Sequence, residues 1–395
     1  MKKVALVLPE QGLPVPAVLG GAIETLVELL ADINEKEKKL DLTIYSRYNA
    51  DAEKKSKNYK CSRFVYIKDA KGIDKLRYSV GYRLNKKNYL GNYYSRIFED
   101  CKKNDFDYIV AEGGHYPAFK KFSKEFGKKK VALHIHHHCK DSDAITGIFG
   151  ATISVSNFIN NAWVESKKDY SADNDQKNYA LINAVDEEKF IKPVGAKEKS
   201  ELRKKLGFSD DDIVVAYIGR ILEVKGVKEL VEAVAGLNDP HIKVLVIGSA
   251  GFADNPKENY ADDVIATIEK NNCGAHLGYV DNKDVYKYAK IADIRCLPSK
   301  WEEAGSLALV ESLHCGVPLI VTRSGGMPEV VEGAGAVIVS KDERLVDELA
   351  QAIKKLAADS TLRQKMTKEN LERSKKFRKL EFYNNFVKII EGEAK

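Results

Sequence analysis

The sequence has no long hydrophobic run. None of its 395 residues lies in an apolar stretch of the about 18 residues that a membrane-spanning helix needs. The N-terminal segment MKKVALVLPEQG is interrupted by Pro9 and Glu10 before it could form the apolar region of a signal peptide. We therefore expect a cytoplasmic protein.

Cysteine patterns and common nucleotide-binding fingerprints are also lacking. The six cysteines are far apart and form no CxxC pair, which disfavours a disulfide framework and a structural zinc site. Neither GxxxxGK[ST] nor a GxGxxG motif after a strand occurs. No recognised nucleic-acid-binding module is present, so nucleic acid is not an expected partner.

The composition is that of a soluble globular protein, with 44% hydrophobic and 31% charged residues. Six short, β-branched runs, each followed by a helix-period segment, occur before residue 186, and six more follow residue 211. This pattern predicts the α/β fold class, with βα units around parallel sheets in two Rossmann-like domains. We predict an N-terminal domain over 1–195 and a C-terminal domain over 196–378, with a polar linker around their junction.

One segment, residues 53–103, is rich in positive charge. It holds fifteen Lys or Arg against five Asp or Glu. The tyrosines interleaved with these charges are Tyr59, Tyr66, Tyr78, Tyr82, Tyr89, Tyr93 and Tyr94. Two interpretations stay open: a basic, aromatic surface that contacts an anionic membrane or phosphates, or the solvated face of ordinary helices and loops.

Two acids, Glu303 and Glu311, mark a helical pattern that follows a strand and a turn. Gly305, Ser306 and Leu307 would form the helix start, whose free N–H groups suit a phosphate or a sugar hydroxyl. A helical rise separates the two carboxylates by about 12 Å, which fits two hydroxyl clusters on one extended ligand such as a nucleotide sugar. Alternatively, the acids only favour a helix N-terminus or a surface position.

Two basic side chains and two glycines also stand between a strand and a helix. Arg220 and Lys225 precede a helix after a strand, so both could reach a diphosphate at the strand ends. Gly20 and Gly21 precede the first helix, where they could admit phosphate or acceptor or simply make the turn.

The segment ALHIHHHCK contains four histidines. Strand alternation puts His134, His136 and His138 on one face and His137 on the other. Because no complementary ligand cluster is evident, we favour a cleft histidine that bonds a substrate hydroxyl over a zinc site. One or two of the four would then be structural.

Together these elements resemble the retaining glycosyltransferases of family 4, which have the GT-B fold. The resemblance rests on GGAIETLVELL, ISVSNFI, LINAVDEEKF, IGRILEVKGVKELVEA and TRSGGMPEVV, and on the E-x7-E spacing of Glu303 and Glu311, all in family order. It implies two Rossmann-like domains that face each other across a cleft. It also implies that a C-terminal helix, 379–395, packs back on the first domain.

The resemblance further implies roles for individual residues. Glu303 contacts the donor sugar near the reaction centre, with His136 close to the transferred sugar. Glu311 holds the ribose, and Arg220 with Lys225 neutralises the leaving diphosphate. The remaining donor contacts are the backbone of Gly305, Ser306 and Leu307, and Tyr279 with Val280 beside the nucleotide base.

We therefore expect a retaining transferase that moves a hexose or N-acetylhexosamine from a nucleoside diphosphate sugar, with UDP favoured, to a hydroxyl of a glycan or lipid-linked acceptor. No cofactor or metal is expected. The setting would be surface polysaccharide or lipopolysaccharide synthesis, with peripheral contact to the inner membrane face. The alternatives are a GT-B sugar-nucleotide epimerase and a non-catalytic sugar-nucleotide-binding or structural protein.

Overall fold

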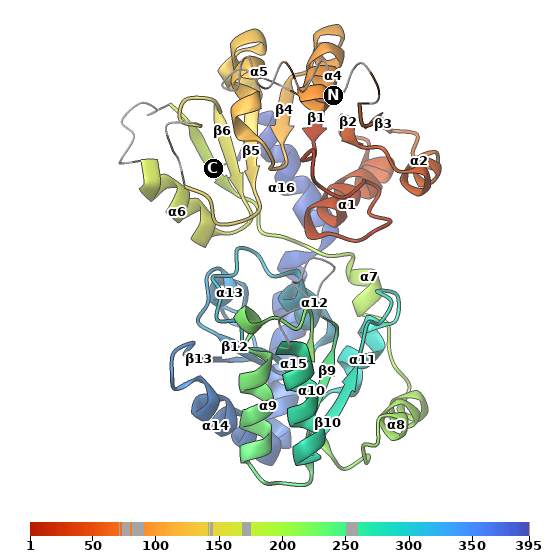
Figure 1. Cartoon of the computed structure of the whole chain (residues 1–395), viewed down its shortest axis with the longest axis vertical. Helices are drawn as coiled ribbons and strands as arrows, with labels where there is room; N and C mark the ends of the chain where they lie inside the picture. Colours follow the sequence, from red (N-terminus) through yellow and green to blue (C-terminus); the bar gives the residue numbers. More distant parts are fainter. Residues whose placement is uncertain are drawn as a thin grey trace. The chain divides into compact units, whose positions relative to one another are not determined.

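The computed structural model describes residues 1–70, 72, 80, 91–140, 142, 145–167, 175–249 and 260–394. The chain divides into two units: unit 1 is Met1–Ala184 with Lys379–Lys395, and unit 2 is Val185–Arg378 (Figure 1). Among the described residues, no helix combines the length and the apolar character needed to cross a bilayer.

Unit 1 is built on a seven-stranded sheet in the order β3-β2-β1-β4-β5-β6-β7. Every pairing in it is parallel. The strands are β1 (Lys2–Val7), β2 (Leu40–Arg47), β3 (Ser62–Ile67), β4 (Tyr108–Ala111), β5 (Val131–Ile135), β6 (Ala151–Ser154) and β7 (Lys177–Ala180). The chain starts at the centre of the sheet and reverses direction between β1 and β4, which is the doubly wound topology.

Helices flank this sheet (Figure 1). They are α1 (Ala22–Glu37), α2 (Ala50–Ser56), α4 (Gly91–Lys103), η1 (Tyr116–Ala118), α5 (Phe119–Phe126), η2 (Lys128–Lys130), α6 (Asn157–Ser166) and the C-terminal α16 (Lys379–Glu391). Helix α16 packs on α1. The buried Tyr383 hydroxyl donates to Asn34 Oδ1 at 2.6 Å and accepts from Lys39 N–H at 3.2 Å. These contacts make the C-terminal helix a part of unit 1.

Unit 2 has a six-stranded parallel sheet in the order β10-β9-β8-β11-β12-β13. Its strands are β8 (Ile213–Ile218), β9 (Ile242–Ile247), β10 (Gly274–Leu277), β11 (Ile294–Leu297), β12 (Leu319–Thr322) and β13 (Ala336–Val339). Its helices are α7 (Glu187–Phe190), α8 (Ala196–Lys205), η4 (Glu223–Lys225), α9 (Val227–Gly236), α10 (Tyr260–Asn271), α11 (Val285–Ile291), α12 (Leu307–Cys315), α13 (Met327–Val330), α14 (Leu345–Ala358), α15 (Ser360–Ser374) and η5 (Lys375–Phe377). The two parallel α/β sheets confirm the predicted fold class.

The basic segment 53–103 contains core as well as surface, which corrects its interpretation as one surface. It forms strand β3 and helix α4, in which Tyr93 and Tyr94 are only 2% and 1% exposed. The Tyr93 hydroxyl donates to the carbonyl oxygen of Leu8 at 3.1 Å. A count of charges along the chain does not separate the two faces of α4. It therefore does not reveal that one face of the helix is buried in the core. Of the other tyrosines, Tyr59 and Tyr66 are half-buried, and Tyr78, Tyr82 and Tyr89 lie outside the described residues.

Candidate functional site

One polar site of unit 2 lies where two neighbouring strands end. Glu303 follows β11 and Lys225 follows β8, and these strands pair directly. Lys225 Nζ lies 2.5 Å from Glu303 Oε1, and the hydroxyl of Ser299 donates to the same oxygen at 2.6 Å. Among the residues that the structure describes, both contacts of this carboxylate use Oε1, so Oε2 is the oxygen that could accept a hydrogen bond from a ligand.

Backbone contacts fix the loop that carries Glu303. The carbonyl oxygen of Glu303 accepts from Gly326 N–H at 2.7 Å, and its N–H faces the Ser324 hydroxyl oxygen at 3.4 Å. The neighbouring Glu302 accepts from Gly325 N–H at 2.6 Å and pairs with Lys341. Gly325 has a φ of 52°, and a Cβ there would lie well inside 3.0 Å of the Glu303 backbone. The loop therefore holds Glu303 by close backbone packing.

Helix α12 starts directly after this loop. Ser306 is its N-cap, and the Ser306 side chain accepts from Leu309 N–H at 3.3 Å. The first turn of a helix leaves N–H groups without partners in the helix and presents the positive end of the dipole. Gly305, Ser306 and Leu307 are half-buried at this end. The position suits an anionic or hydroxyl-rich ligand.

Glu311 lies in α12, within electrostatic reach of the buried Arg295. Burial raises the pKa of Glu311 to about 7, although Arg295 and Lys189 act in the opposite direction. Arg295, on β11, is 1% exposed, and its Nε and Nη2 have no hydrogen-bond partner in the described structure. Cys315, on the same helix, stays neutral because burial raises the pKa of its thiol to about 12. Glu311 is thus an acid that titrates near neutral pH.

If the nucleotide sugar expected from the sequence binds through Glu311, its affinity should depend on pH. If ionised Glu311 accepts hydrogen bonds from the ligand, protonation below pH 7 removes that acceptor. The dissociation constant of a nucleotide sugar should then be about tenfold larger at pH 6 than at pH 8. Calorimetry with an intact nucleotide sugar measures this, because the esterified diphosphate does not titrate in that window. The variant Glu311→Gln should show a flat profile, and a tenfold dependence that persists in it would contradict the assignment.

Arg220 and Lys225 differ in what they contact. Arg220 is exposed, and its backbone carbonyl oxygen accepts from the Tyr217 hydroxyl at 2.6 Å and from Leu222 N–H at 3.1 Å. Among the described residues its guanidinium makes no ion pair, whereas Lys225 is already paired with Glu303. Both follow β8 at the carboxyl end of the sheet. The guanidinium of Arg220 could therefore pair with an incoming anion. Lys225, five residues further along the chain, is already held by its ion pair with Glu303.

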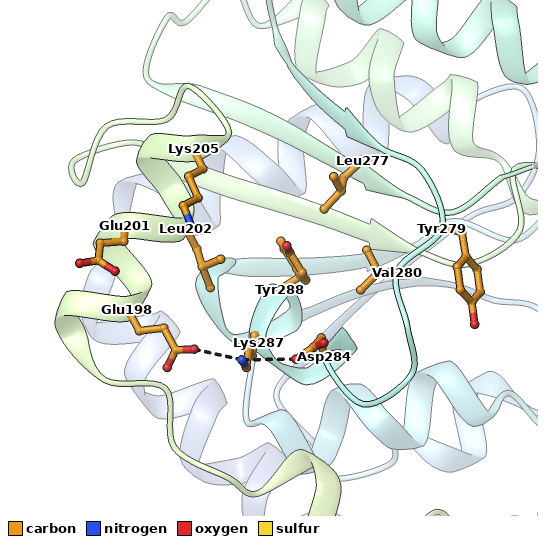
Figure 2. A pocket seen from close by; sticks show the side chains of 10 residues that line it. All are labelled: Glu198, Glu201, Leu202, Lys205, Leu277, Tyr279, Val280, Asp284, Lys287 and Tyr288. Atoms are coloured by element: carbon orange, nitrogen blue, oxygen red, sulfur yellow. Dashed lines mark ion pairs between the residues drawn. The ribbon is translucent and has the colours of Figure 1, made fainter.

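Tyr279 and Val280 lie on the loop after β10 and line a pocket of about 540 Å³ (Figure 2). Val280, Leu277 and Tyr288 pack against a buried apolar cluster that includes Leu245 and Ile247 of β9. Tyr279 is 79% exposed, and its ring stands apart from the other lining side chains in Figure 2. Lys287 bridges Glu198 and Asp284, at 3.3 Å from each, on the wall of the pocket. Tyr279 thus offers an open aromatic face.

In unit 1, Gly20 and Gly21 precede α1, with φ values of 79° and 96°. Gly21 is the N-cap of the helix, and a Cβ there would meet the Glu24 carboxylate. Glu24 is buried and accepts from Leu13 N–H at 2.8 Å. At Gly20 the space around a Cβ is open. Gly21 is required by packing, and Gly20 leaves room for a ligand.

The histidine segment meets an acid that sequence reasoning missed. His134 Nδ1 and His136 Nε2 both lie 2.8 Å from Oε2 of Glu112, which directly follows β4. Burial would raise the pKa of Glu112, but the two histidines outweigh it and lower that pKa to about 2. Burial lowers the pKa of His136 to about 4, although Glu112 opposes the shift. We call these three residues the Glu–His–His cluster.

The other two histidines stand outside this cluster. His137 Nε2 lies 3.4 Å from the Tyr116 hydroxyl, and His138 faces the ring of Phe158. The only sequence signal for Glu112 was its place at the end of a predicted strand. Because β4 and β5 are paired, that position brings it beside His134 and His136.

A family model described as Glycosyl transferases group 1 matches residues 198–373, which lie within unit 2. Spore coat protein SA of Bacillus subtilis (strain 168) is 24% identical over 378 residues, 93% of each chain. A GDP-mannose-dependent monoacylated alpha-(1-6)-phosphatidylinositol monomannoside mannosyltransferase of Corynebacterium glutamicum is 29% identical over 194 residues, 47% of this chain and 48% of that one. The solved structure of Anabaena HepE in complex with UDP has a TM-score of 0.76 at 16% identity and covers 99% of this chain and 100% of that chain.

Proposed function

We propose that the chain is a retaining glycosyltransferase of the group 1 family, with the GT-B fold, and that it moves a hexose or N-acetylhexosamine from a nucleotide sugar. The donor would be a UDP-sugar. The acceptor would be a hydroxyl of a glycan or lipid-linked molecule in the synthesis of a surface polysaccharide or lipopolysaccharide.

One observation carries this proposal: the contact between Lys225 and Glu303 beside the start of α12. The ammonium of Lys225 would neutralise the leaving diphosphate, together with exposed Arg220 and the N–H groups at Gly305 to Leu307. Oε2 of Glu303 would accept from a hydroxyl of the donor sugar. Glu311, further along α12, would accept from the ribose, and the base would pack at Tyr279 and Val280.

The proposed chemistry is a front-face displacement. The bond from the anomeric carbon to the diphosphate oxygen breaks while the acceptor oxygen approaches on the same face, and the leaving phosphate oxygen takes the acceptor proton. No protein nucleophile is needed, so the side chains act by positioning and by stabilising charge. Arg220 and Lys225 would neutralise the diphosphate in place of a divalent metal.

The choice of nucleotide and acceptor has separate support. UDP is favoured because it is bound in the HepE structure that shares this fold. The mannosyltransferase relative is named for GDP-mannose and a phosphatidylinositol mannoside, so a lipid-linked acceptor has a precedent among the relatives while the base differs. In unit 1, His136 would bond a hydroxyl near the transferred sugar, and the open space at Gly20, next to Gly21, would admit substrate at the start of α1.

Release of free nucleotide from UDP-, GDP- and ADP-sugars tests the proposal. We expect slow hydrolysis of one donor, unchanged when EDTA is added to the assay. Arg220→Ala should lower this rate by at least about tenfold, and Arg344→Ala, which removes an exposed arginine elsewhere in unit 2, should not. Conversion of the donor into an isomeric nucleotide sugar would instead indicate an epimerase. If the protein binds a donor but shows no turnover that changes in Glu303→Ala, it would be a non-catalytic binding protein.

Peripheral membrane contact is a separate prediction. Exposed lysines of segment 53–103 gather near α2 and at the end of α4: Lys54, Lys57, Lys60, Lys102 and Lys103. We expect the protein to sediment with vesicles of anionic lipid at about 0.05 M salt and to be released at about 0.5 M, because salt screens such charges. Vesicles of neutral lipid are the control. Absence of binding to anionic vesicles at low salt would contradict this part.

A further inference from the structure

The Glu–His–His cluster contains an unusual buried acid. Glu112 is 0% exposed and His134 is 1% exposed, while His136 keeps a small accessible edge. Among the described residues, no lysine or arginine pairs with the Glu112 carboxylate; its partners are the two imidazoles. Oε1 of Glu112 is buried and has no hydrogen-bond partner there. A buried carboxylate is costly unless a cation or a full set of donors compensates it.

Strand pairing explains why the three side chains converge. Strands β4 and β5 run parallel with Ala111 opposite Leu133, so Glu112 emerges beside His134. His134 and His136 are two residues apart and point to the same side. One ligand atom from each of the three residues lies within 4.8 Å of the others. This convergence is built into the sheet, since Glu112 and His134 are held at the ends of paired strands.

The ligand set is that of a divalent transition metal. Two imidazoles and one carboxylate bind zinc in catalytic sites that keep an open fourth position. With bonds of about 2.0–2.1 Å, a tetrahedral ion separates its ligand atoms by about 3.3 Å. Each nitrogen now lies 2.8 Å from Oε2, so each N···O distance would have to lengthen by only about half an ångström.

We propose that Glu112, His134 and His136 bind one Zn²⁺ ion through Oε2, Nδ1 and Nε2, respectively. The fourth position opens on the side of His136, the least buried of the three, where a water or a hydroxyl group can bind. The ion compensates the buried carboxylate and holds the ends of β4 and β5 together.

The proposed zinc site is additional to the proposed donor site. The ion would lie in unit 1, whereas Arg220, Lys225 and Glu303 belong to unit 2 and would handle the diphosphate without it. Loss of donor turnover in EDTA that Mg²⁺ or Mn²⁺ restores would contradict the proposed role of Arg220 and Lys225. Loss that only one equivalent of Zn²⁺ restores would support the cluster and leave that role intact.

The first experiment uses the full chain without a histidine tag. We expect about one Zn²⁺ per chain by elemental analysis after growth with zinc. After removal of zinc with a strong chelator, titration with Co²⁺ should give the visible absorption of a tetrahedral His-ligated ion and saturate at one equivalent. Competition with a coloured chelator then gives the Zn²⁺ affinity. None of these measurements depends on catalytic turnover.

Variants locate the ion. His136→Gln and Glu112→Gln should each weaken Zn²⁺ binding by at least about 100-fold. The matched control is His314→Gln, which removes a buried histidine of unit 2 whose Nε2 lies 3.3 Å from the Phe377 carbonyl oxygen. It should retain one equivalent of zinc. A parent protein that keeps its fold by circular dichroism but binds neither Zn²⁺ nor Co²⁺ would overturn the inference and leave the cluster a hydrogen-bonded triad. Equal zinc binding by the parent and both cluster variants would likewise overturn it.

Discussion

Lys225→Met should lower donor turnover by about 10²–10³-fold, the range seen when one group that stabilises developing charge is removed. The substitution keeps the length and the apolar stem of the side chain but removes the ammonium that lies 2.5 Å from Glu303 Oε1. Two functions are lost together. The leaving diphosphate loses a cation, and the partly buried Glu303 loses its compensating charge, which allows its carboxylate to turn.

The matched control is Lys341→Met. Lys341 pairs with Glu302, the residue before Glu303, so the control removes the same charge from the adjacent acid of the same loop. We expect its turnover to stay within about tenfold of the parent, because the Glu302 carboxylate accepts a hydrogen bond from the loop backbone, at Gly325 N–H. Steady-state nucleotide release measures both variants. If Lys225→Met retains activity within threefold of the parent, Lys225 has no role at the diphosphate.

A double variant tests whether Lys225 and Glu303 act as one unit. If they are independent, the losses in Lys225→Met and Glu303→Gln multiply. Because the two side chains share a contact, we expect the double variant to be clearly more active than the product of the two single variants' relative activities predicts. Multiplicative losses would mean that the ion pair has no functional coupling.

The repeated βα pattern was enough to predict the fold class, because its signal is local. Each strand of a parallel sheet is a short apolar run, and each crossover is a helix-period segment. The strand β3, SRFVYI, was overlooked because arginine and tyrosine made it look like part of a basic surface. Tyr93 and Tyr94 were assigned to that surface for the same reason, although α4 turns them into the core.

Contacts that depend on strand order were beyond sequence reasoning. Lys225 and Glu303 are 78 residues apart and meet because β8 pairs with β11. Ser299 joins them only because the loop after β11 folds back on itself. Glu112 meets His136 because β4 is next to β5. The E-x7-E spacing identified Glu303 and Glu311, but nothing local in the sequence indicates the groups that surround their carboxylates.

The second large effect is expected from a single methyl group at Gly325. Its φ of 52° is a left-handed conformation, and an added Cβ would overlap the backbone of Glu303. Gly325→Ala therefore has to displace the loop and lengthen the 2.7 Å hydrogen bond from Gly326 N–H to the Glu303 carbonyl oxygen. A displacement of about 1 Å at a positioned group can cost about 10²-fold in rate, which is the loss of donor turnover that we expect.

Gly333→Ala separates this effect from ordinary backbone strain. Gly333 has a φ of 74°, also left-handed, but nothing lies within 4 Å of an added Cβ. Both variants should lose about 1–2 kcal/mol of unfolding free energy from the left-handed backbone, measured by urea denaturation, and Gly325→Ala should lose more. Only Gly325→Ala should lose turnover, because only its methyl group pushes on the loop that carries Glu303. Equal turnover in the two variants would show that the position of this loop does not limit the reaction.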